Sequence, residues 1–308
     1  MNVLNIMLPV FLVIGLGYGL RLLGFIREDT NAWLSRLVFY VAAPLLLFYS
    51  TAQNSFDWGT GIPMLLAIGG MTVLVTVVVY AGSARLTPAR RGVLTQGALR
   101  SNIVFVGLPV VLYAYGEPAL GPASILIGFM VVVDNLLAVL VLTLPHQQHS
   151  VRDPNLWVNT ALRIAKNPLI WGCGGGFLYS LLGIGLPVSI DRSLALIGRT
   201  AAPLGLLCVG ASLEFRKLRS DIPGTAVAAI IKLILYPALI FGTLRKLGLE
   251  GIDLGVPVMI MACPTAVVSY IMAREMQGDP QLGAAIVIGT TVASMITLLA
   301  WLTFLGVG

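Results

Sequence analysis

Charged residues are scarce in this chain of 308 residues. Asp, Glu, Lys and Arg together make up 10% of the sequence, whereas they form about a quarter of an ordinary globular chain. Hydrophobic residues account for 57%, and the mean hydropathy is +0.93. This composition excludes a soluble protein and favours a chain that crosses a membrane many times.

Cysteine and histidine are also rare, which excludes several kinds of site. Cys173, Cys208 and Cys263 fall inside apolar stretches and lack the spacing of a zinc site or a disulfide framework. His146 and His149 lie in a polar loop, and two histidines are too few for a metal site. The HExxH, GxSxG and GxxxxGK[ST] motifs are absent as well. We therefore expect no metal, no cofactor and no catalytic residues, which argues against an intramembrane enzyme.

Ten apolar stretches of about 20 residues follow one another along the chain. We number them as spans 1 to 10, and they cover roughly 2–23, 31–52, 61–82, 92–114, 120–143, 166–184, 194–213, 222–243, 254–273 and 281–304. The fold class that we expect is an all-α membrane protein of ten transmembrane helices.

The two halves of the chain repeat each other. Pairs of matching positions are Ala42-Ala43-Pro44 with Ala201-Ala202-Pro203, Ile62-Pro63 with Ile222-Pro223, and Gly116 with Gly278. Each half holds five spans, and an odd number of spans places the second half upside down in the membrane, as in secondary transporters. We expect inverted repeats at 1–144 and 166–308, with a cytoplasmic linker at 145–165 between them.

Lysine and arginine are distributed unevenly between the two ends of these spans. The ends that follow spans 1, 3, 5, 7 and 9 carry Arg21, Arg27, Arg36, Arg85, Arg90, Arg91, Arg152, Arg163, Lys166, Arg216, Lys217, Arg219 and Arg274. The opposite ends carry only Arg192, Arg199, Arg245 and Lys246. Because cytoplasmic loops are rich in these residues, both chain termini are expected outside the cytoplasm. The net charge of +6 is then a topology signal, and no nucleic-acid partner is expected.

Three charged residues lie within spans, where a charge costs several kcal/mol and usually marks function. They are Arg100 in span 4, Asp134 in span 5 and Lys232 in span 8. Asp134 and Lys232 are flanked by apolar residues and are expected to be deep. One interpretation is a pair that titrates or switches during transport, and the alternative is a static salt bridge. Arg100 is either a site residue or an anchor that reaches toward the membrane surface.

Spans 4 and 9 contain helix breakers in corresponding positions of the two repeats. Span 4 reads Asn102 through Gly107-Leu108-Pro109, and span 9 reads Pro264-Thr265 through Ser269. Proline removes a backbone donor, and unwound backbone survives at membrane depth only where it lines a cavity or is buried in protein. We expect helices 4 and 9 to be broken and to cross, with half-helix N-termini directed at an anion. The substrate-binding candidates are Asn102, Gly107, Pro109, Pro264, Thr265, Ser269 and Arg100. An ordinary proline kink is the alternative.

Two glycine-rich stretches, Gly15–Gly19 and Gly172–Gly176, resemble nucleotide-binding loops only superficially. No strand precedes either stretch, so we expect them to allow close packing of helices.

These features together resemble the auxin efflux carrier family, which joins plant auxin exporters to many bacterial permeases. The resemblance covers nearly the whole chain. It rests on the order and spacing of Asn102 to Pro109, Lys166-Asn167-Pro168, Ala202-Pro203 with Gly210-Ala211-Ser212-Leu213, Lys232 with Tyr236-Pro237, and Pro264 with Tyr270.

The resemblance implies a fold related to sodium/bile acid symporters. Spans 1, 2, 6 and 7 would form a scaffold, and spans 3–5 and 8–10 would form a mobile transport domain. The chain lacks the long hydrophilic loop of the plant carriers, which leaves auxin open as a substrate and indicates a short, bacterial-type member of the inner membrane.

The sequence therefore predicts a secondary transporter of a small organic anion, a mono- or dicarboxylate, with an elevator-like alternating-access mechanism. Asp134 and Lys232 are the candidates for ion coupling, and the coupling ion is H+ or Na+. An uncoupled uniporter or channel is the alternative. Membrane lipids are expected partners, and a homodimer is expected by analogy with such folds.

Overall fold

The computed structural model describes residues 3–53, 58–146, 158, 161–162, 165–218 and 220–307. Most of the expected linker, with Arg152, Arg163 and His149, lies outside these residues, as does Arg219. Within the described residues the chain forms helices and no strand, and one isolated β-bridge joins two segments. The all-α class is therefore confirmed.

The first half of the chain runs from α1 to η4. Its elements are α1 (Val3–Leu22), α2 (Glu28–Leu37), η1 (Val38–Ala42), α3 (Ala43–Ala52), α4 (Trp58–Gly82), α5 (Pro88–Gly97), η2 (Ile103–Gly107), α6 (Leu108–Tyr115), η3 (Glu117–Ala119), α7 (Leu120–Thr143) and η4 (Leu144–His146). The second half continues with α9 (Pro168–Ser180), α10 (Val188–Gly198), α11 (Ala201–Ala211), α12 (Phe215–Leu218), α13 (Ile222–Ile230), η5 (Ile231–Leu235), α14 (Tyr236–Lys246), α15 (Gly251–Ala262), α16 (Val268–Glu275) and α17 (Pro280–Phe304).

In the part of the chain that the structure describes, six helical stretches are long and apolar enough to cross a membrane. They are Glu28–Ala52, Gly61–Gly82, Glu117–Thr143, Val188–Ala211, Ile222–Lys246 and Pro280–Phe304. Shorter apolar helices cover Met7–Leu22, Ile103–Tyr115 and Gly251–Ala262. The chain is thus an integral membrane protein. The layout of ten spans in two inverted repeats stays a prediction.

One expected span differs from the structure. Span 7 was expected at 194–213, but its helix begins earlier, at Val188, and is interrupted between α10 and α11. The reason is Pro203, which has no N–H to donate to the carbonyl of Arg199, so that the helix restarts at Ala201.

Wide π-turns precede three of the prolines. η1 comes just before Pro44, η2 before Pro109 and η5 before Pro237. A proline leaves the carbonyl four residues earlier without its donor, and a π-turn makes room for the ring. Behind Pro237 the freed carbonyl of Leu233 accepts a hydrogen bond from the indole of Trp301 at 2.8 Å.

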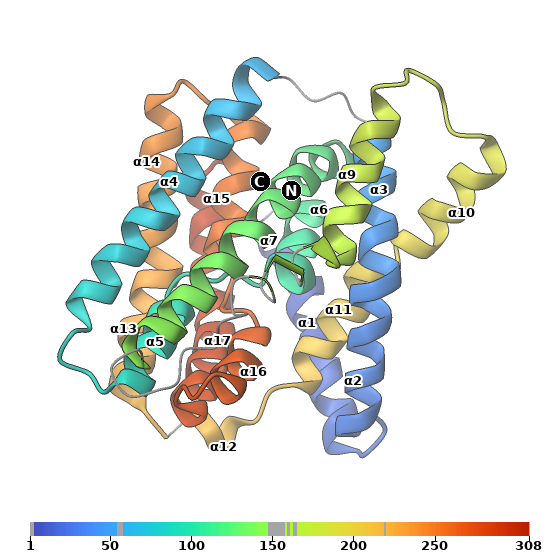
Figure 1. Cartoon of the computed structure of the whole chain (residues 1–308). Coiled ribbons are helices and arrows are strands. Elements are labelled where there is room, and N and C mark those ends of the chain that lie inside the picture. The colour runs from blue at the N-terminus through green and yellow to red at the C-terminus, as the bar shows by residue number, and fades with distance from the viewer. Residues whose placement is uncertain are drawn as a thin grey trace.

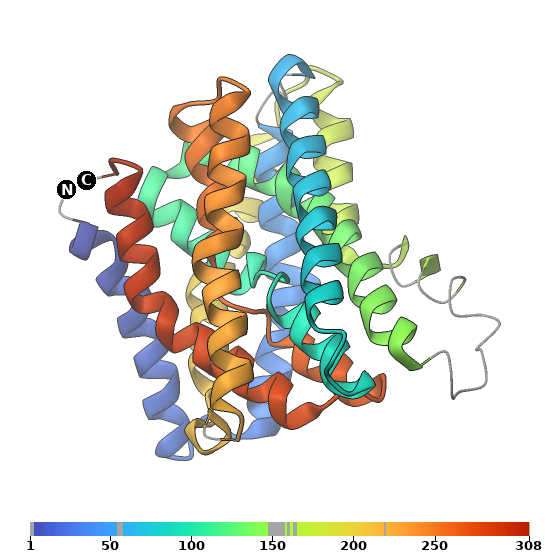
Figure 2. The ribbon, with the colours of Figure 1, turned by 90° about the vertical axis from the view of Figure 1, so that its left-hand side faces the viewer.

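The helices gather into two groups (Figure 1). α3 packs against α9 and α10 on one side, with α2 extending below them, and α1 packs against α11. On the other side α14 packs against α4 and α15, and α13 packs against α17. α1 and α17, from the two ends of the described chain, lie side by side (Figure 2).

Glycines allow the close contacts within the first group. A Cβ on Gly17 would overlap the backbone of Leu207, and one on Gly172 would overlap Pro44. Gly15 and Gly19, by contrast, have open space around them. The expected role of these stretches in helix packing is therefore confirmed, for the glycines that face a neighbour.

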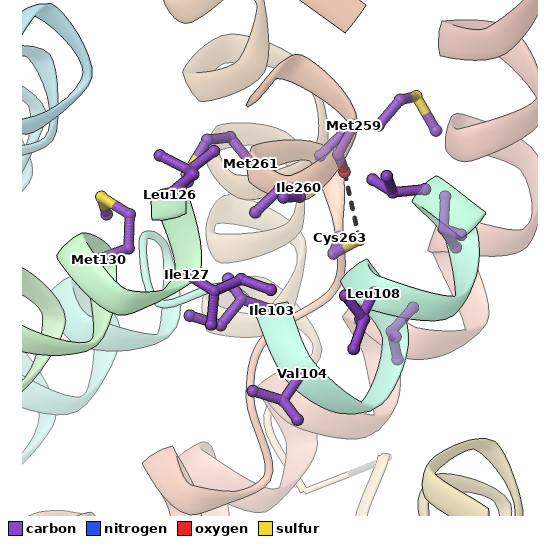
Figure 3. Packing of buried hydrophobic residues seen from close by; sticks show 14 of the residues in the cluster. Ile103, Val104, Leu108, Leu126, Ile127, Met130, Met259, Ile260, Met261 and Cys263 are labelled. Carbon is purple, nitrogen blue, oxygen red and sulfur yellow. Dashed lines mark hydrogen bonds between the residues drawn. The ribbon is translucent and has the colours of Figure 1, made fainter. Parts of the chain in front are cut away.

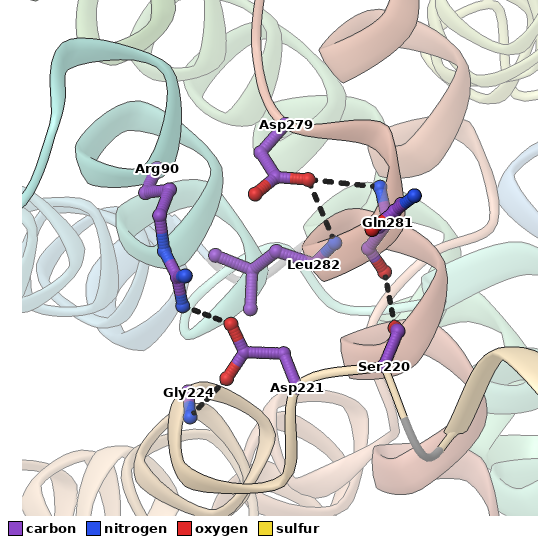
Figure 4. A network of polar contacts seen from close by, with 7 residues as sticks. All are labelled: Arg90, Ser220, Asp221, Gly224, Asp279, Gln281 and Leu282. Carbon is purple, nitrogen blue, oxygen red and sulfur yellow. Dashed lines mark hydrogen bonds and ion pairs between the residues drawn. The ribbon is translucent and has the colours of Figure 1, made fainter.

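A polar network ties three helix N-termini together in the second group (Figure 4). Arg90 of α5 forms an ion pair with Asp221, which also caps α13 by accepting from the amide of Gly224 at 2.9 Å. Asp279 caps α17 through the amides of Gln281 and Leu282, and its own amide donates to the carbonyl of Ala89. These contacts join α5, α13 and α17 at one end of the molecule.

Candidate functional site

Two helices are broken within the spans in which the sequence predicts a break, the first of them ahead of the segment from Asn102 to Pro109 that was expected to unwind. The helix that begins with α5 is unwound over residues 98–102 before η2 begins. The helix that begins with α15 is unwound over 263–267 before α16 begins. The two unwound segments meet in an antiparallel bridge between Ser101 and Thr265.

Backbone hydrogen bonds run between the two breaks. The amide of Asn102 donates to the carbonyl of Pro264 at 2.8 Å, and the amide of Ala266 donates to the carbonyl of Arg100 at 3.1 Å. Asn102 and Pro264, which come from the two breaks, are thus in direct contact. Each segment satisfies backbone groups that its partner has lost, as buried irregular backbone in a membrane requires.

Local chemistry explains why the second helix breaks. Pro264 disfavours a helical conformation of the residue before it, and Cys263 is extended, with φ −63° and ψ 153°. The hydroxyl of Thr265 donates to the carbonyl of Gly97, the last residue of α5, at 2.6 Å. The amide of Thr265 donates to the hydroxyl of Thr290 in α17 at 3.1 Å. Thr265 therefore holds the crossing together.

The inner side of the crossing packs against an apolar core (Figure 3). Ile103 and Leu108 approach Ile127 of α7 and Cys263 of the second break in this view, and all four side chains are buried. Gly107 lies here too, and its amide donates to the carbonyl of Asn102 at 2.9 Å.

Lys232 is fully buried beside the crossing. Its ammonium group donates to the hydroxyl of Ser101 at 2.7 Å and to the carbonyl of Met261 at 2.5 Å, and it lies 5.2 Å from the ring centre of Tyr236. Met261 belongs to the last turn of α15, where free carbonyls and the helix dipole favour a cation. The cation-binding end of this half-helix is therefore already occupied by a side chain of the protein.

Arg100 has two hydrogen-bond partners, whereas Asp134 does not contact the partner that was expected for it. The guanidinium group of Arg100 donates to the amide oxygen of Asn135 at 3.0 Å and to the sulfur of Met272 at 2.8 Å. Asp134 is buried, and in the described part of the chain no hydrogen bond or ion pair engages its carboxylate. No ion pair joins Asp134 to Lys232 among these residues. The roles of both residues in transport stay predictions.

A cavity of about 570 Å³ separates the two groups of helices at the crossing. One wall comes from α2, η1 and α11, with Asn31 and Ser35 among its polar residues. The other wall comes from α7 and the two breaks, with Arg100, Asn102 and Asp134. A volume of this size suits a small organic molecule.

Two helix N-termini border this cavity. Ile103, Val104 and Phe105 begin one helix, Val267 and Val268 begin the other, and all five line the cavity. Within the described chain no hydrogen bond engages their backbone amides. Free amides at a helix N-terminus, together with the positive end of the helix dipole, form a site for an anion.

The candidate residues thus divide into two sets. Arg100, Asn102 and Asp134 line the cavity. The remaining candidates are not among the residues that line it, and they are Gly107, Pro109, Pro264, Thr265, Ser269 and Lys232. Their contacts hold the crossing in shape; the carbonyl of Ser269, for example, accepts from the side chain of Gln96 at 2.7 Å.

Several polar residues of the cavity were not predicted from the sequence. Asn135 holds Arg100, and its position next to Asp134 in an otherwise apolar helix was the signal that could have revealed it. Asn31 and Ser35 are four residues apart and share one face of α2, which is the spacing of a polar stripe on a helix. Ser101, next to Asn102, binds Lys232.

Comparisons with known proteins agree with a membrane carrier. The model of a family described as membrane transport proteins matches residues 2–302. An uncharacterized transporter of Methanothermobacter thermautotrophicus is 26% identical, over 96% of this chain and 95% of its own length. A Rhizobium meliloti protein named a putative malonate transporter is 23% identical, over 96% and 94%. The auxin efflux carrier component 1 of Arabidopsis thaliana is 24% identical over 46% of this chain and 24% of its own length.

Proposed function

Because the chain belongs to the membrane transport protein family, to which the auxin efflux carriers belong, we propose that it carries a small organic anion across the membrane. The anion is a mono- or dicarboxylate. The observation that carries the proposal is the pair of helix N-termini with free amides beside one cavity of suitable volume. The relative named as a malonate transporter supports the same class of substrate.

The carboxylate of the substrate binds at the crossing. The amides at the start of η2 and α16 donate to its oxygens, and the side chain of Asn102 adds a further donor. The charge of Arg100, held in place by Asn135, raises the positive potential in the cavity. The apolar residues between these groups enclose the carbon skeleton of the substrate.

Transport occurs by an elevator-like movement of one helix group against the other. α1, α2, α3, α9, α10 and α11 form the scaffold, and α4–α7 with α13–α17 form the transport domain. Each group combines spans from both inverted repeats, and both chain termini lie outside the cytoplasm. The cavity reaches the ends of α2 and α11 that adjoin the arginine-rich loops, so this conformation opens toward the cytoplasm. Movement of the substrate is coupled to H+ or Na+, and the protein resides in a bacterial inner membrane.

Counterflow in proteoliposomes tests this proposal. Vesicles loaded with an unlabelled acid are diluted into the same acid carrying a radioactive label, and the panel holds malonate, malate, acetate and indole-3-acetate. A carrier gives a transient accumulation of label for at least one acid, whereas empty liposomes give none. A flux that only equilibrates, without counterflow, would indicate a channel and contradict a carrier.

A further inference from the structure

A second, much smaller cavity, the small chamber, lies on the opposite side of Arg100 and Asp134 from the large cavity. It lies between α4, α5 and α7 and has a volume of about 10 Å³. Its polar wall consists of Thr72, Thr76, Thr95, Gln96, Arg100 and Asp134. A space of this size accommodates about one water molecule. Arg100 and Asp134 line both this chamber and the large cavity, so they form the wall between them.

The chamber is rich in hydrogen-bond acceptors. The hydroxyl protons of Thr76 and Thr95 are donated to backbone carbonyls of their own helices at 2.7 and 2.8 Å, which leaves lone pairs on the oxygens. Among the described residues, the buried amide oxygen of Gln96 has no partner, because its NH₂ group is directed to Ser269. Among the same residues, the carboxylate of Asp134 has no hydrogen bond. A water molecule can donate to two of these acceptors and can accept from a protonated carboxyl group.

The charges around Asp134 decide between a neutral water and a metal cation. The charged or titratable groups that face it are Arg100 from the first break, Lys232 and Tyr236 from η5 and α14, and Glu28 and Arg36 across the large cavity. Of the other elements packed against α7, α3, α4, α6 and α9 carry no acidic or basic side chain, α5 carries Arg90 and Arg91 in its first turn, η3 carries Glu117, η4 carries His146, and α15 carries Asp253 in its first turn.

A sodium ion in the chamber would lie beside the fixed charge of Arg100, and like charges repel strongly where the dielectric constant is low. The other place suited to a cation, the carbonyl end of α15, holds the ammonium group of Lys232. Both observations disfavour sodium.

From this geometry we infer that Asp134 binds a coupling proton, that one water in the chamber accepts from its protonated carboxyl group and donates to the amide oxygen of Gln96 and to the hydroxyl of Thr76 or Thr95, and that the carrier uses H+ and not Na+. The inference rests on the proposed function and names its coupling ion. The proton reaches a carboxylate oxygen of Asp134 from water in the large cavity, forms an O–H bond there, and leaves by the same cavity after the transport domain has moved. As this bond forms, one O–H bond of the hydronium ion that delivers the proton breaks and a water molecule remains, and release of the proton to water is the reverse transfer.

A polar chain connects the chamber to the crossing. Thr72 and the hydroxyl of Tyr236 are 2.6 Å apart, and Tyr236 donates to the sulfur of Met261 at 3.3 Å. Lys232 binds both the carbonyl of Met261 and the hydroxyl of Ser101. A change of charge at Asp134 therefore has a contiguous route to the segment that binds substrate.

The test compares two gradients in proteoliposomes with whichever acid of the panel gives counterflow. The native protein is expected to accumulate that acid under a pH gradient without sodium, and not under a sodium gradient at equal pH. Asp134→Asn is expected to lose accumulation under the pH gradient while it retains counterflow. Thr76→Val with Thr95→Val is expected to reduce accumulation several-fold, and the matched control Thr143→Val, which removes the hydroxyl of a residue of α7 that does not line the chamber, is expected to leave it unchanged.

Each outcome has one meaning. Accumulation driven by sodium, or undiminished pH-driven accumulation in both Asp134→Asn and the double threonine variant, would overturn the inference and leave the proposed function intact. Absence of counterflow in the native protein for every acid would reject the proposed function and the inference with it. If Asp134→Asn fails to fold, the double threonine variant still decides.

Discussion

At the scale of single residues, charge and polarity in an apolar sequence located the site, but not the contacts within it. Arg100, Asn102 and Asp134 were expected in the site and line the cavity. The expected partner of Lys232 was Asp134, yet its ammonium group binds a hydroxyl and a carbonyl. A sequence indicates that a buried charge needs a partner. It does not show which backbone carbonyl at a helix end accepts from that charge, because every residue type carries the same carbonyl.

Asn102→Ala is expected to weaken substrate binding without unfolding the protein. The side chain of Asn102 stands at the start of η2, beside the free amides, and its loss removes a donor to a charged carboxylate. Such a hydrogen bond contributes about 1.5–3 kcal/mol, which corresponds to roughly 10- to 150-fold weaker binding. The half-saturating concentration in counterflow measures the effect.

Asn31→Ala provides the matched control for this variant. Asn31 lines the same cavity from α2 and donates to the hydroxyl of Ser212. Its replacement is expected to change the free energy of substrate binding by no more than about 0.6 kcal/mol. The half-saturating concentration should therefore stay within about threefold of native. Equal effects at both positions would show that the crossing has no special part in binding.

At the scale of helices, proline and glycine predicted where helices break or pack closely, but not the backbone conformation at each of these points. Pro264 predicted the break in span 9, and Pro109 was part of the predicted break in span 4, which the structure places at residues 98–102, ahead of that proline. The π-turns before Pro44, Pro109 and Pro237 were not predicted, because a proline alone does not reveal which group takes over the freed carbonyl.

Gly17→Ala is expected to destabilise the contact between α1 and α11, while Gly15→Ala is expected to have little effect. A methyl group on Gly17 would overlap the backbone of Leu207, which has no freedom to move aside, whereas Gly15 faces open space. Overpacking of this kind costs about 1–3 kcal/mol of folding free energy. Thermal unfolding midpoints in detergent compare the two variants, and equal midpoints would contradict the observed packing.

Trp301→Phe is expected to lower stability by about 1–3 kcal/mol, because the carbonyl of Leu233 loses its indole donor and remains buried without a partner. Trp33→Phe serves as the control, since Trp33 is 70% exposed. The unfolding midpoint of the first variant should fall below that of the control. A midpoint unchanged from native would show that the carbonyl behind Pro237 needs no donor.

At the scale of the whole molecule, the repeat in the sequence predicted which segments meet. Two unwound segments about half the chain apart pair through the bridge between Ser101 and Thr265. The sequence did not predict the large cavity, because its two walls come from helices with no shared motif and its volume depends on how the two groups of helices stand in this conformation. It did not predict the small chamber either, which arises from the packing of α4, α5 and α7.

If the substrate binds in the large cavity, it should protect a cysteine placed in the cavity wall from a thiol reagent. Ser35→Cys lines the cavity, and Ser193→Cys on α10 is exposed and is not among the residues that line it. Both are made in a Cys208→Ser background, because Cys208 also lines the cavity. The solubilised protein is labelled with a thiol reagent at increasing concentrations of a transported acid. We expect the transported acid to slow labelling at position 35, with half-protection near the concentration that half-saturates counterflow. The rate at position 193 should be the same with and without the acid. Equal rates at position 35 with and without a saturating transported acid would contradict binding of the substrate in the large cavity.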